Sequence, residues 1–358
     1  MTEGKNIANW LSKTKKALDT SYNSDKHVTV SIRSFDNIKD KEKEDIRKEL
    51  VDSSYGLSKE KINAFLDVCH SIHEYTMGIV RISVITNTVS SNLAAQVKRS
   101  LYRANAIMDL FGGGFGIGSD KNIKIVLVPI KERRKKPNPT NKIVMPSHIN
   151  GGYTYTVEQG QDARIFIYRL EEWPKVMLHE IVHNIPKIQN IQWGDSDIRK
   201  MYKMFGIDNV GCPDACKTVL EPTEAVVEAW AIFLHTAFLC HETGSNFYEL
   251  IKKEIVWNDH HTRWILEKQQ NGLGGIWREG THAFSYIVLR GIILHNLNKF
   301  LGMRMPYSPT TLERLWEDGW KKLRKNIMSA RSEPGAKNKN KNENEKGNSM
   351  RMSVYGDL

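Results

Sequence analysis

Residues 179–183 read His-Glu-Ile-Val-His, inside a stretch (residues 174–185) that predicts one apolar helix. Two histidines four residues apart project from the same face of a helix, so His179 and His183 can bind one metal ion together. Pro174 near the start and Pro186 just after the end mark the limits of this helix. The residues around the histidines are apolar, as expected in a core: Val176, Met177, Leu178, Ile181, Val182 and Ile185. The chain must therefore fold around this helix and enclose its polar groups.

The motif also carries an acid. Glu180 follows the first histidine, where its carboxylate can reach a water molecule on a metal held by the two imidazoles. A catalytic zinc ion takes three protein ligands and keeps a fourth position for water. A second predicted helix, residues 222–241, carries Glu224 and Glu228, and either carboxylate can supply the third ligand. The alternative is a buried helix whose histidines are satisfied by hydrogen bonds and bind no metal.

With these residues the sequence resembles the zincin metallopeptidases, and among them the gluzincins, whose third zinc ligand is a glutamate. Several gluzincin families carry that ligand in a Glu-x-x-x-Asp pattern, often followed by an aromatic residue and Ala; residues 224–231 here read EAVVEAWA. The resemblance implies that His179, His183 and Glu224 bind one zinc ion. It further implies that Glu228 orients a zinc-bound histidine and that Glu180 is the general base. Because Glu228 is one methylene longer than the family's Asp, the reverse assignment, with Glu228 as the ligand, stays open.

The resemblance also implies a fold class and a substrate surface. We expect an α+β, zincin-like fold, with an upper α/β lobe containing a mixed sheet, the HExxH helix in the middle, and a lower, mostly helical lobe. The strand before the zinc helix, with Ile165, Phe166 and Ile167, is expected at the edge of the sheet, where it would pair with an extended peptide substrate. Tyr286 or His282 of the lower lobe would stabilise the oxyanion formed in hydrolysis. The alternative for Tyr286 is an ordinary half-buried tyrosine.

Residues 149–231 also resemble uncharacterised zincin-like proteins of large DNA viruses, through the dispersed segments NGGY, RLEEWPKV and EAWA. The N-terminus lacks the apolar segment of a secretion signal, and no run approaches 18 apolar residues. We therefore expect a cytoplasmic or intracellular protein that does not enter a membrane. For a viral protein, the location would be the host cell or the virion.

The pattern of elements divides the chain into three parts: a mostly helical extension (1–76), a zincin-like catalytic domain (77–328) and a disordered basic tail (329–358). In the extension the pattern predicts a strand over residues 27–32 and helices over 40–51 and 58–77. The catalytic domain begins with strands and one helix, over 79–86, 91–111 and 123–130, and a hairpin of 152–156 with 163–170. Helices over 222–241, 246–256, 282–301 and 310–325 follow the zinc helix.

The formal net charge of +11 is concentrated in two segments. The stretch from Lys131 to Lys142 holds six basic residues and one acid, and residues 321–358 hold ten basic and four acidic residues, so the rest of the chain is neutral. These segments can make weak contact with nucleic acid or another polyanion. The alternative is a solvated loop and tail, since no aromatic residues alternate with the basic ones as stacking platforms.

The four cysteines are too few for a disulfide framework. Cys212 and Cys216 are expected to be free thiols in a loop, because no other metal-ligating residues have suitable spacing nearby. Cys69 and Cys240 lie in apolar stretches and are expected in the core.

The expected function is hydrolysis of peptide bonds in a protein or peptide substrate, with one Zn²⁺ per chain. Glu180 favours an enzyme, because a zinc site without turnover has no need of a base beside its first ligand. Two alternatives remain. One is a catalytically silent zincin-fold interaction or structural protein, and the other is a nucleic-acid-associated factor that acts through the basic loop and tail.

Overall fold

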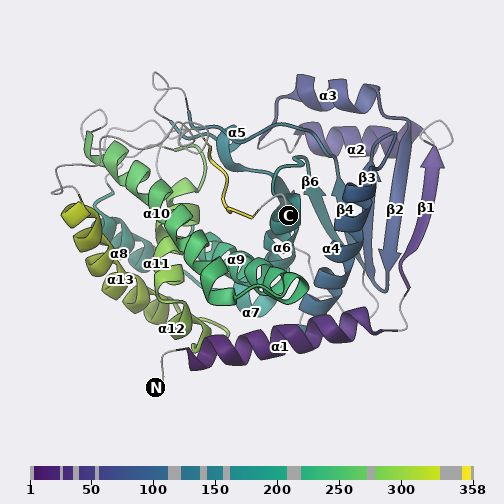
Figure 1. The fold of residues 1–358 in the computed structure, drawn as a ribbon. Coiled ribbons are helices and arrows are strands. Elements are labelled where there is room, and N and C mark those ends of the chain that lie inside the picture. The colour runs from purple at the N-terminus through teal and green to yellow at the C-terminus, as the bar shows by residue number, and fades with distance from the viewer. Residues whose placement is uncertain are drawn as a thin grey trace.

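The computed structural model describes residues 4–24, 27–34, 40–52, 56–111, 122–137, 143–155, 162–207, 219–271, 279–330 and 349–355. The predicted thiol loop with Cys212 and Cys216, and most of the predicted tail, lie outside the described residues. The described part is a mixed α+β structure with a six-stranded sheet on one side and a group of helices on the other (Figure 1).

The sheet is mixed and has the order β1-β2-β3-β4-β6-β5. Its strands are β1 (Thr29–Ser34), β2 (Ser71–Met77), β3 (Val80–Ile85), β4 (Ile123–Leu127), β5 (Gly152–Thr154) and β6 (Ala163–Ile167). Strand β4 runs parallel to both of its neighbours, β3 and β6. The outer pairs β1–β2, β2–β3 and β5–β6 are antiparallel. The strands at the two edges are therefore β1 and β5.

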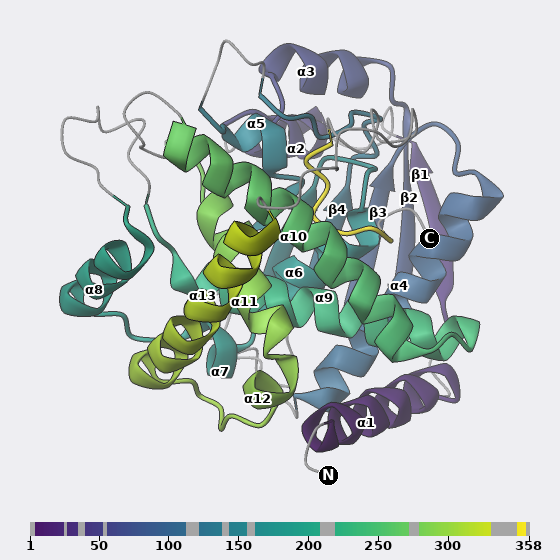
Figure 2. The ribbon, with the colours of Figure 1, turned by 60° about the vertical axis from the view of Figure 1, so that its left-hand side comes forward.

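Helices surround the sheet and form the other half of the molecule (Figures 1 and 2). The first group is α1 (Lys5–Tyr22), α2 (Asp40–Asp52), α3 (Lys59–Asp67), α4 (Ser91–Leu110), α5 (Pro146–Ile149), α6 (Trp173–His183) and α7 (Pro186–Gln189). The second group is α8 (Asp195–Phe205), α9 (Pro222–Thr243), α10 (Phe247–Asn271), the π-helix η3 (Ser285–Leu289), α11 (Arg290–His295), α12 (Leu297–Leu301) and α13 (Pro309–Ala330).

Alternation along the strands gives the sheet two apolar faces. Successive residues of a strand point to opposite sides, so Ile165 and Ile167 of β6 face one way and Phe166 faces the other. Ile165 and Ile167 belong to the main core cluster with the apolar residues of α4, α6 and α9. Phe166 packs in a smaller cluster with Leu50 of α2 and Leu66 of α3. Helix α6, which carries His179, Glu180 and His183, is thus held between the sheet and the helical half.

The expectation that Ile165, Phe166 and Ile167 form an edge strand is wrong. Strand β6 pairs with β4 on one side and with β5 on the other, so both of its backbone edges are occupied. The predicted hairpin is confirmed, and it places β5 outside β6. The edge beside α6 therefore belongs to β5, Gly152–Thr154.

The helix predicted over residues 58–77 is also wrong in its second half. Helix α3 ends at Asp67, and residues 71–77 form β2, which pairs with both β1 and β3. Pairing across β2 fixes Glu74 between Arg33 and Arg81 of the adjacent strands. The sheet therefore crosses the boundary predicted between residues 76 and 77.

The predicted tail is not disordered throughout. Helix α13 extends to Ala330, and at residues 349–355 the chain returns to the core, where Met350, Met352, Ser353 and Tyr355 are buried. Ser349 forms a bridge with Lys135 of the basic stretch. Within that stretch Arg134 is also buried and paired with Glu172, so it does not belong to an exposed basic surface.

Helix α9 is long and apolar enough to cross a membrane by length and composition. In this structure 89% of its most apolar 18-residue window is buried by the rest of the chain. A central core helix meets the same criterion, and the positions of Ala229, Trp230 and Phe233, all without solvent exposure, are those of a core helix.

Candidate metal centre

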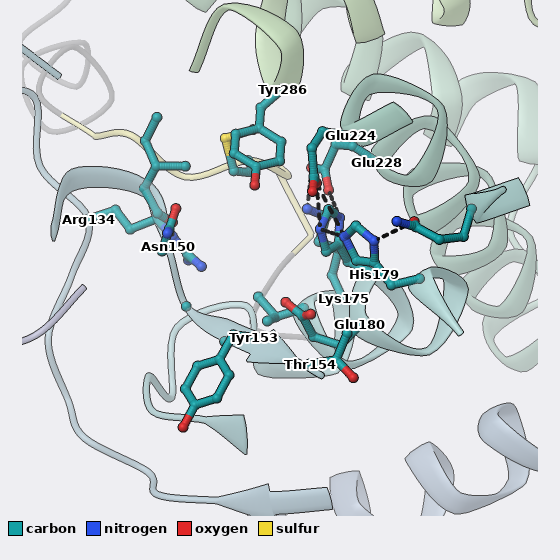
Figure 3. A pocket seen from close by; sticks show the side chains of 17 residues that line it. Arg134, Asn150, Tyr153, Thr154, Lys175, His179, Glu180, Glu224, Glu228 and Tyr286 are labelled. Carbon is teal, nitrogen blue, oxygen red and sulfur yellow. Dashed lines mark hydrogen bonds and ion pairs between the residues drawn. The ribbon is translucent and has the colours of Figure 1, made fainter. Parts of the chain in front are cut away.

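Two helices carry the motif residues. Helix α6 begins with Pro174 in its first turn and holds His179, Glu180 and His183. Helix α9 begins in the same way at Pro222. The two helices pack directly against each other. This contact brings the two glutamates of α9 to the histidines, and Figure 3 shows Glu224 and Glu228 side by side above the His179 ring.

Three side-chain atoms converge on one point. The Nε2 atoms of His179 and His183 are 3.0 Å apart. Oε2 of Glu224 lies 3.4 Å from the first and 3.2 Å from the second. Zinc ligands at about 2.0–2.1 Å in a tetrahedron stand about 3.3–3.4 Å from one another. The three atoms therefore have the mutual spacing of ligands around a small cation.

The hydrogen bonds on the far side of each ring set the tautomers. Nδ1 of His179 lies 2.7 Å from Oε2 of Glu228, and Nδ1 of His183 lies 2.9 Å from Oε1 of Gln189. A carboxylate and an amide oxygen only accept, so in the neutral histidines both protons are on Nδ1. Both Nε2 lone pairs then face the same point as the Glu224 carboxylate, an arrangement that favours a positive charge between them.

The environment of Glu224 also favours a positive charge at this point. Its Oε2 atom is buried and makes no hydrogen bond, although it lies beside two imidazoles. Such an orphaned buried oxygen is costly unless a ligand completes it. Burial by itself would lower the pKa of His179, but Glu224 and Glu228 outweigh it and raise that pKa to about 10. The site favours a cation, and the buried group of His179, Glu180 and His183 could hold a metal ion.

Glu228 occupies a different environment. Its Oε1 atom accepts from the Lys175 ammonium and, at 2.9 Å, from Nη1 of Arg290, while Oε2 faces His179. Burial opposes ionisation, but Lys175, His179 and Arg290 hold the pKa of Glu228 well below its usual range. Both its oxygens have partners and one of them binds His179, whereas Oε2 of Glu224 faces the space between the two Nε2 atoms.

Glu180 lies in the cavity next to the metal position, with 5% of its surface exposed. Burial raises the pKa of its carboxyl group, and the neighbouring histidines oppose this shift. A raised pKa makes a carboxylate a stronger base, as proton abstraction from water requires.

Tyr286 reaches the site from the other wall. It lies on the π-helix η3, lines the cavity, and its ring centroid is 5.9 Å from that of His179. Burial, with the carboxylates of Glu224 and Glu180, raises the pKa of Tyr286 well above its usual value, so its hydroxyl remains a proton donor. π-Helical turns frequently occur at functional sites.

His282 is placed elsewhere. Its Nδ1 atom is 3.2 Å from the backbone oxygen of Val219, and the residue does not line the cavity. Of the two residues expected to stabilise an oxyanion, only Tyr286 lines the cavity with His179, His183 and Glu224.

The cavity has a volume of about 280 Å³, and one wall is the strand β5. Two glycines of this wall have no room for a side chain, Gly152 against the backbone of β6 and Gly151 against the side chain of Arg134. A Cβ atom on Gly152 would stand 2.8 Å from the backbone oxygen of Phe166, and on Gly151 it would lie 2.2 Å from Nη2 of Arg134. Figure 3 shows Glu180 between this wall and His179.

Several residues of the site were missed by sequence reasoning: Lys175, Gln189, Arg290 and Met352. Two of them could have been predicted from their spacing along a helix. Lys175 precedes His179 by four residues, and Arg290 follows Tyr286 by four, so each shares a helix face with a site residue. Gln189 and Met352 have no such spacing.

Comparisons with protein-family models, with curated proteins and with solved structures found no match to this chain. The resemblance to the gluzincins therefore stays an expectation that rests on the motif residues.

Proposed function

We propose that this protein is a zinc-dependent metallopeptidase, with His179, His183 and Glu224 as the zinc ligands. The observation that carries the proposal is the convergence of two Nε2 atoms and one orphaned carboxylate oxygen, 3.0–3.4 Å apart, with both Nδ1 atoms bound elsewhere. Two imidazoles and one carboxylate are a ligand set of catalytic zinc sites, in which water takes the fourth position. The observed positions favour Glu224 over Glu228 as the third ligand.

A zinc ion bound here would supply a water molecule of lowered pKa and would polarise a carbonyl group. The protein's own residues supply the proton transfers. Glu180 accepts a proton from the attacking water and delivers it to the nitrogen of the departing amine as the carbon–nitrogen bond breaks. The hydroxyl of Tyr286 donates a hydrogen bond to the oxyanion that develops on the former carbonyl oxygen.

The strand β5 supplies the surface for the substrate. Its partner β6 occupies one side, and the other side is the edge of the sheet beside α6. An extended peptide can add to such an edge through backbone hydrogen bonds alone. This backbone lies close to the proposed base, since a Cβ atom on Gly152 would be 3.5 Å from Oε1 of Glu180.

The test combines metal analysis with cleavage of a peptide library. The purified protein is expected to contain one zinc per chain and to cleave peptides, and a chelator should stop the cleavage. His183→Ala is expected to lose both zinc and activity. Normal zinc content in His183→Ala would refute the ligand assignment, and a zinc-loaded wild type without peptidase activity would favour a silent scaffold.

A further inference from the structure

The C-terminal segment, residues 349–355, is held in the core by side chains from several helices. Met350 and Ser353 have no solvent exposure, and Met352 is 4% exposed. In Figures 1 and 2 this segment is the isolated yellow strip that lies between the helical half and the sheet. It is separated from α13 by residues 331–348, which are not described.

Helix α10 binds the backbone carbonyls of the segment. Nε2 of His261 lies 3.0 Å from the oxygen of Ser349, and Nε1 of Trp257 donates to the oxygen of Arg351 at 2.9 Å. These are main-chain contacts, so they fix the path of the segment whatever its side chains are.

Two buried carboxylates bind the backbone amides. Glu172 accepts from the N–H groups of Met352 and Ser353. Glu254 accepts from the Ser353 hydroxyl and, at 3.2 Å, from the N–H of Val354. Glu172 is fully buried and is the N-cap residue of α6, with a left-handed φ of 59°. The segment thus anchors the strained start of the helix that carries both histidines.

A chain of three contacts leads from the segment to the metal position. The backbone oxygen of Met352 accepts from Nη1 of Arg290 at 2.9 Å. The same Nη1 donates to Glu228 at 2.9 Å, and Glu228 binds Nδ1 of His179 at 2.7 Å. The side chain of Met352 also lines the cavity.

We propose that residues 349–355 are a positioning element of the metal centre: docking of this segment fixes Arg290, Glu228 and the start of α6, and thereby orients His179 toward the metal. This inference rests on the zinc site proposed above. Partners that orient a metal-bound histidine typically contribute 10–100-fold in metal affinity. The segment is expected to contribute on that scale, without touching the metal.

The first experiment uses the unaltered full-length protein. Coupling between two sites is reciprocal, so if the docked segment strengthens zinc binding, zinc must strengthen docking. Hydrogen exchange of the peptide covering residues 349–355, followed by mass spectrometry, is expected to slow when zinc is added. Equal exchange with and without bound zinc would overturn the proposal.

The second experiment displaces the segment. Ser353→Glu puts a third carboxylate between Glu172 and Glu254 and is expected to release the segment, lowering zinc affinity 10–100-fold. The d–d absorption spectrum of the Co²⁺-substituted protein should change as well, which loss of general stability alone would not cause. Ser353→Thr keeps the hydroxyl and serves as the matched control, with affinity close to that of wild type.

A folded Ser353→Glu protein that binds zinc like wild type would overturn the proposal. If this variant does not fold, the exchange experiment decides alone. Absence of zinc binding in wild type would overturn both proposals. Zinc binding without peptidase activity would overturn only the proposed function, because both readouts here measure metal binding and docking.

Discussion

Two clusters of polar side chains meet where Glu228 binds His179. They differ in whether every carboxylate oxygen has a hydrogen-bond partner. In the ligand cluster of His179, His183 and Glu224, ring nitrogens and a carboxylate oxygen face one another, and Oε2 of Glu224 has no hydrogen bond. In the charge cluster of Lys175, Glu228 and Arg290, every carboxylate oxygen has a partner. The charge cluster is buried, whereas Glu224 and His183 of the ligand cluster are half-buried and line the cavity. The difference teaches that an incomplete buried cluster marks a place for a ligand, whereas a complete one supports structure.

The most direct test of the difference between the two clusters is to neutralise one glutamate of each. Glu224→Gln removes the anionic ligand and is expected to abolish stoichiometric zinc binding and all zinc-dependent cleavage. Glu228→Gln keeps an oxygen for His179 and is expected to retain zinc with an affinity 10–100-fold lower. Zinc titration of both purified variants is the measurement. The opposite ranking would make Glu228 the ligand.

Glu180 tests whether the ligand cluster is a catalytic site. Glu180→Gln preserves shape but cannot accept a proton, so the cleavage rate is expected to fall by roughly 10²–10⁴-fold or more. Zinc content and melting temperature should stay near those of wild type. The measurement is kcat/KM on a peptide substrate with equal zinc loading. Wild-type rates in this variant would contradict the mechanism.

Lys175 tests the charge cluster. Lys175 is buried and paired with Glu228, and its removal leaves that carboxylate with Arg290 as its one remaining lysine or arginine partner among the described residues. Lys175→Met is therefore expected to lower the free energy of unfolding of the metal-free protein by less than the full loss of a buried pair, about 1–3 kcal/mol. Urea denaturation in the presence of a chelator measures this, with Glu224→Gln as the matched comparison from the ligand cluster. A larger loss in Glu224→Gln would reverse the assignment of structural and functional roles.

Glu254 gives the smallest expected effect and one with a defined pH window. Burial raises the pKa of Glu254 to about 7, above the 4.5 of an ordinary glutamate. Between these values the folded chain holds a proton that the unfolded chain has released, so stability decreases as the pH rises from about 4.5 to 7. Glu254→Gln is expected to remove this decrease, a difference of at most about 3 kcal/mol between pH 5 and 8. Parallel pH profiles of the unfolding midpoint for variant and wild type would show that Glu254 does not titrate in this way.

The sequence allowed prediction of elements whose pattern is local. Helix α4 and strands β3 and β4 follow from periodicity, and α6 follows from apolar residues framed by two prolines. Strand β2 could not be predicted, because its alternation is interrupted by Glu74, which is stabilised by Arg33, Arg81 and Ser83 on the adjacent strands. Pairing between strands decided its structure, and pairing is not visible in a single segment.

The site shows the same limit. Spacing on one helix brought the motif residues together, and it could also have indicated Lys175 and Arg290. The order of the strands was not predictable, so the edge was assigned to β6 when it belongs to β5. The burial of residues 349–355 could not be predicted for another reason. It follows a charged stretch and binds through its backbone, which carries no residue-type signal.

The place of residues 349–355 in the chain has a consequence for biosynthesis. Ribosomes make a protein from its N-terminus, so α6 and α9 leave the ribosome long before this segment does. Until it arrives, Glu172 and Glu254 lack the amide donors that they bind in the folded protein. On the positioning role proposed above, a growing chain with all of its motif residues still lacks a fully oriented metal centre. Under the proposed function, such a chain gains its peptidase activity only after synthesis has passed residue 355.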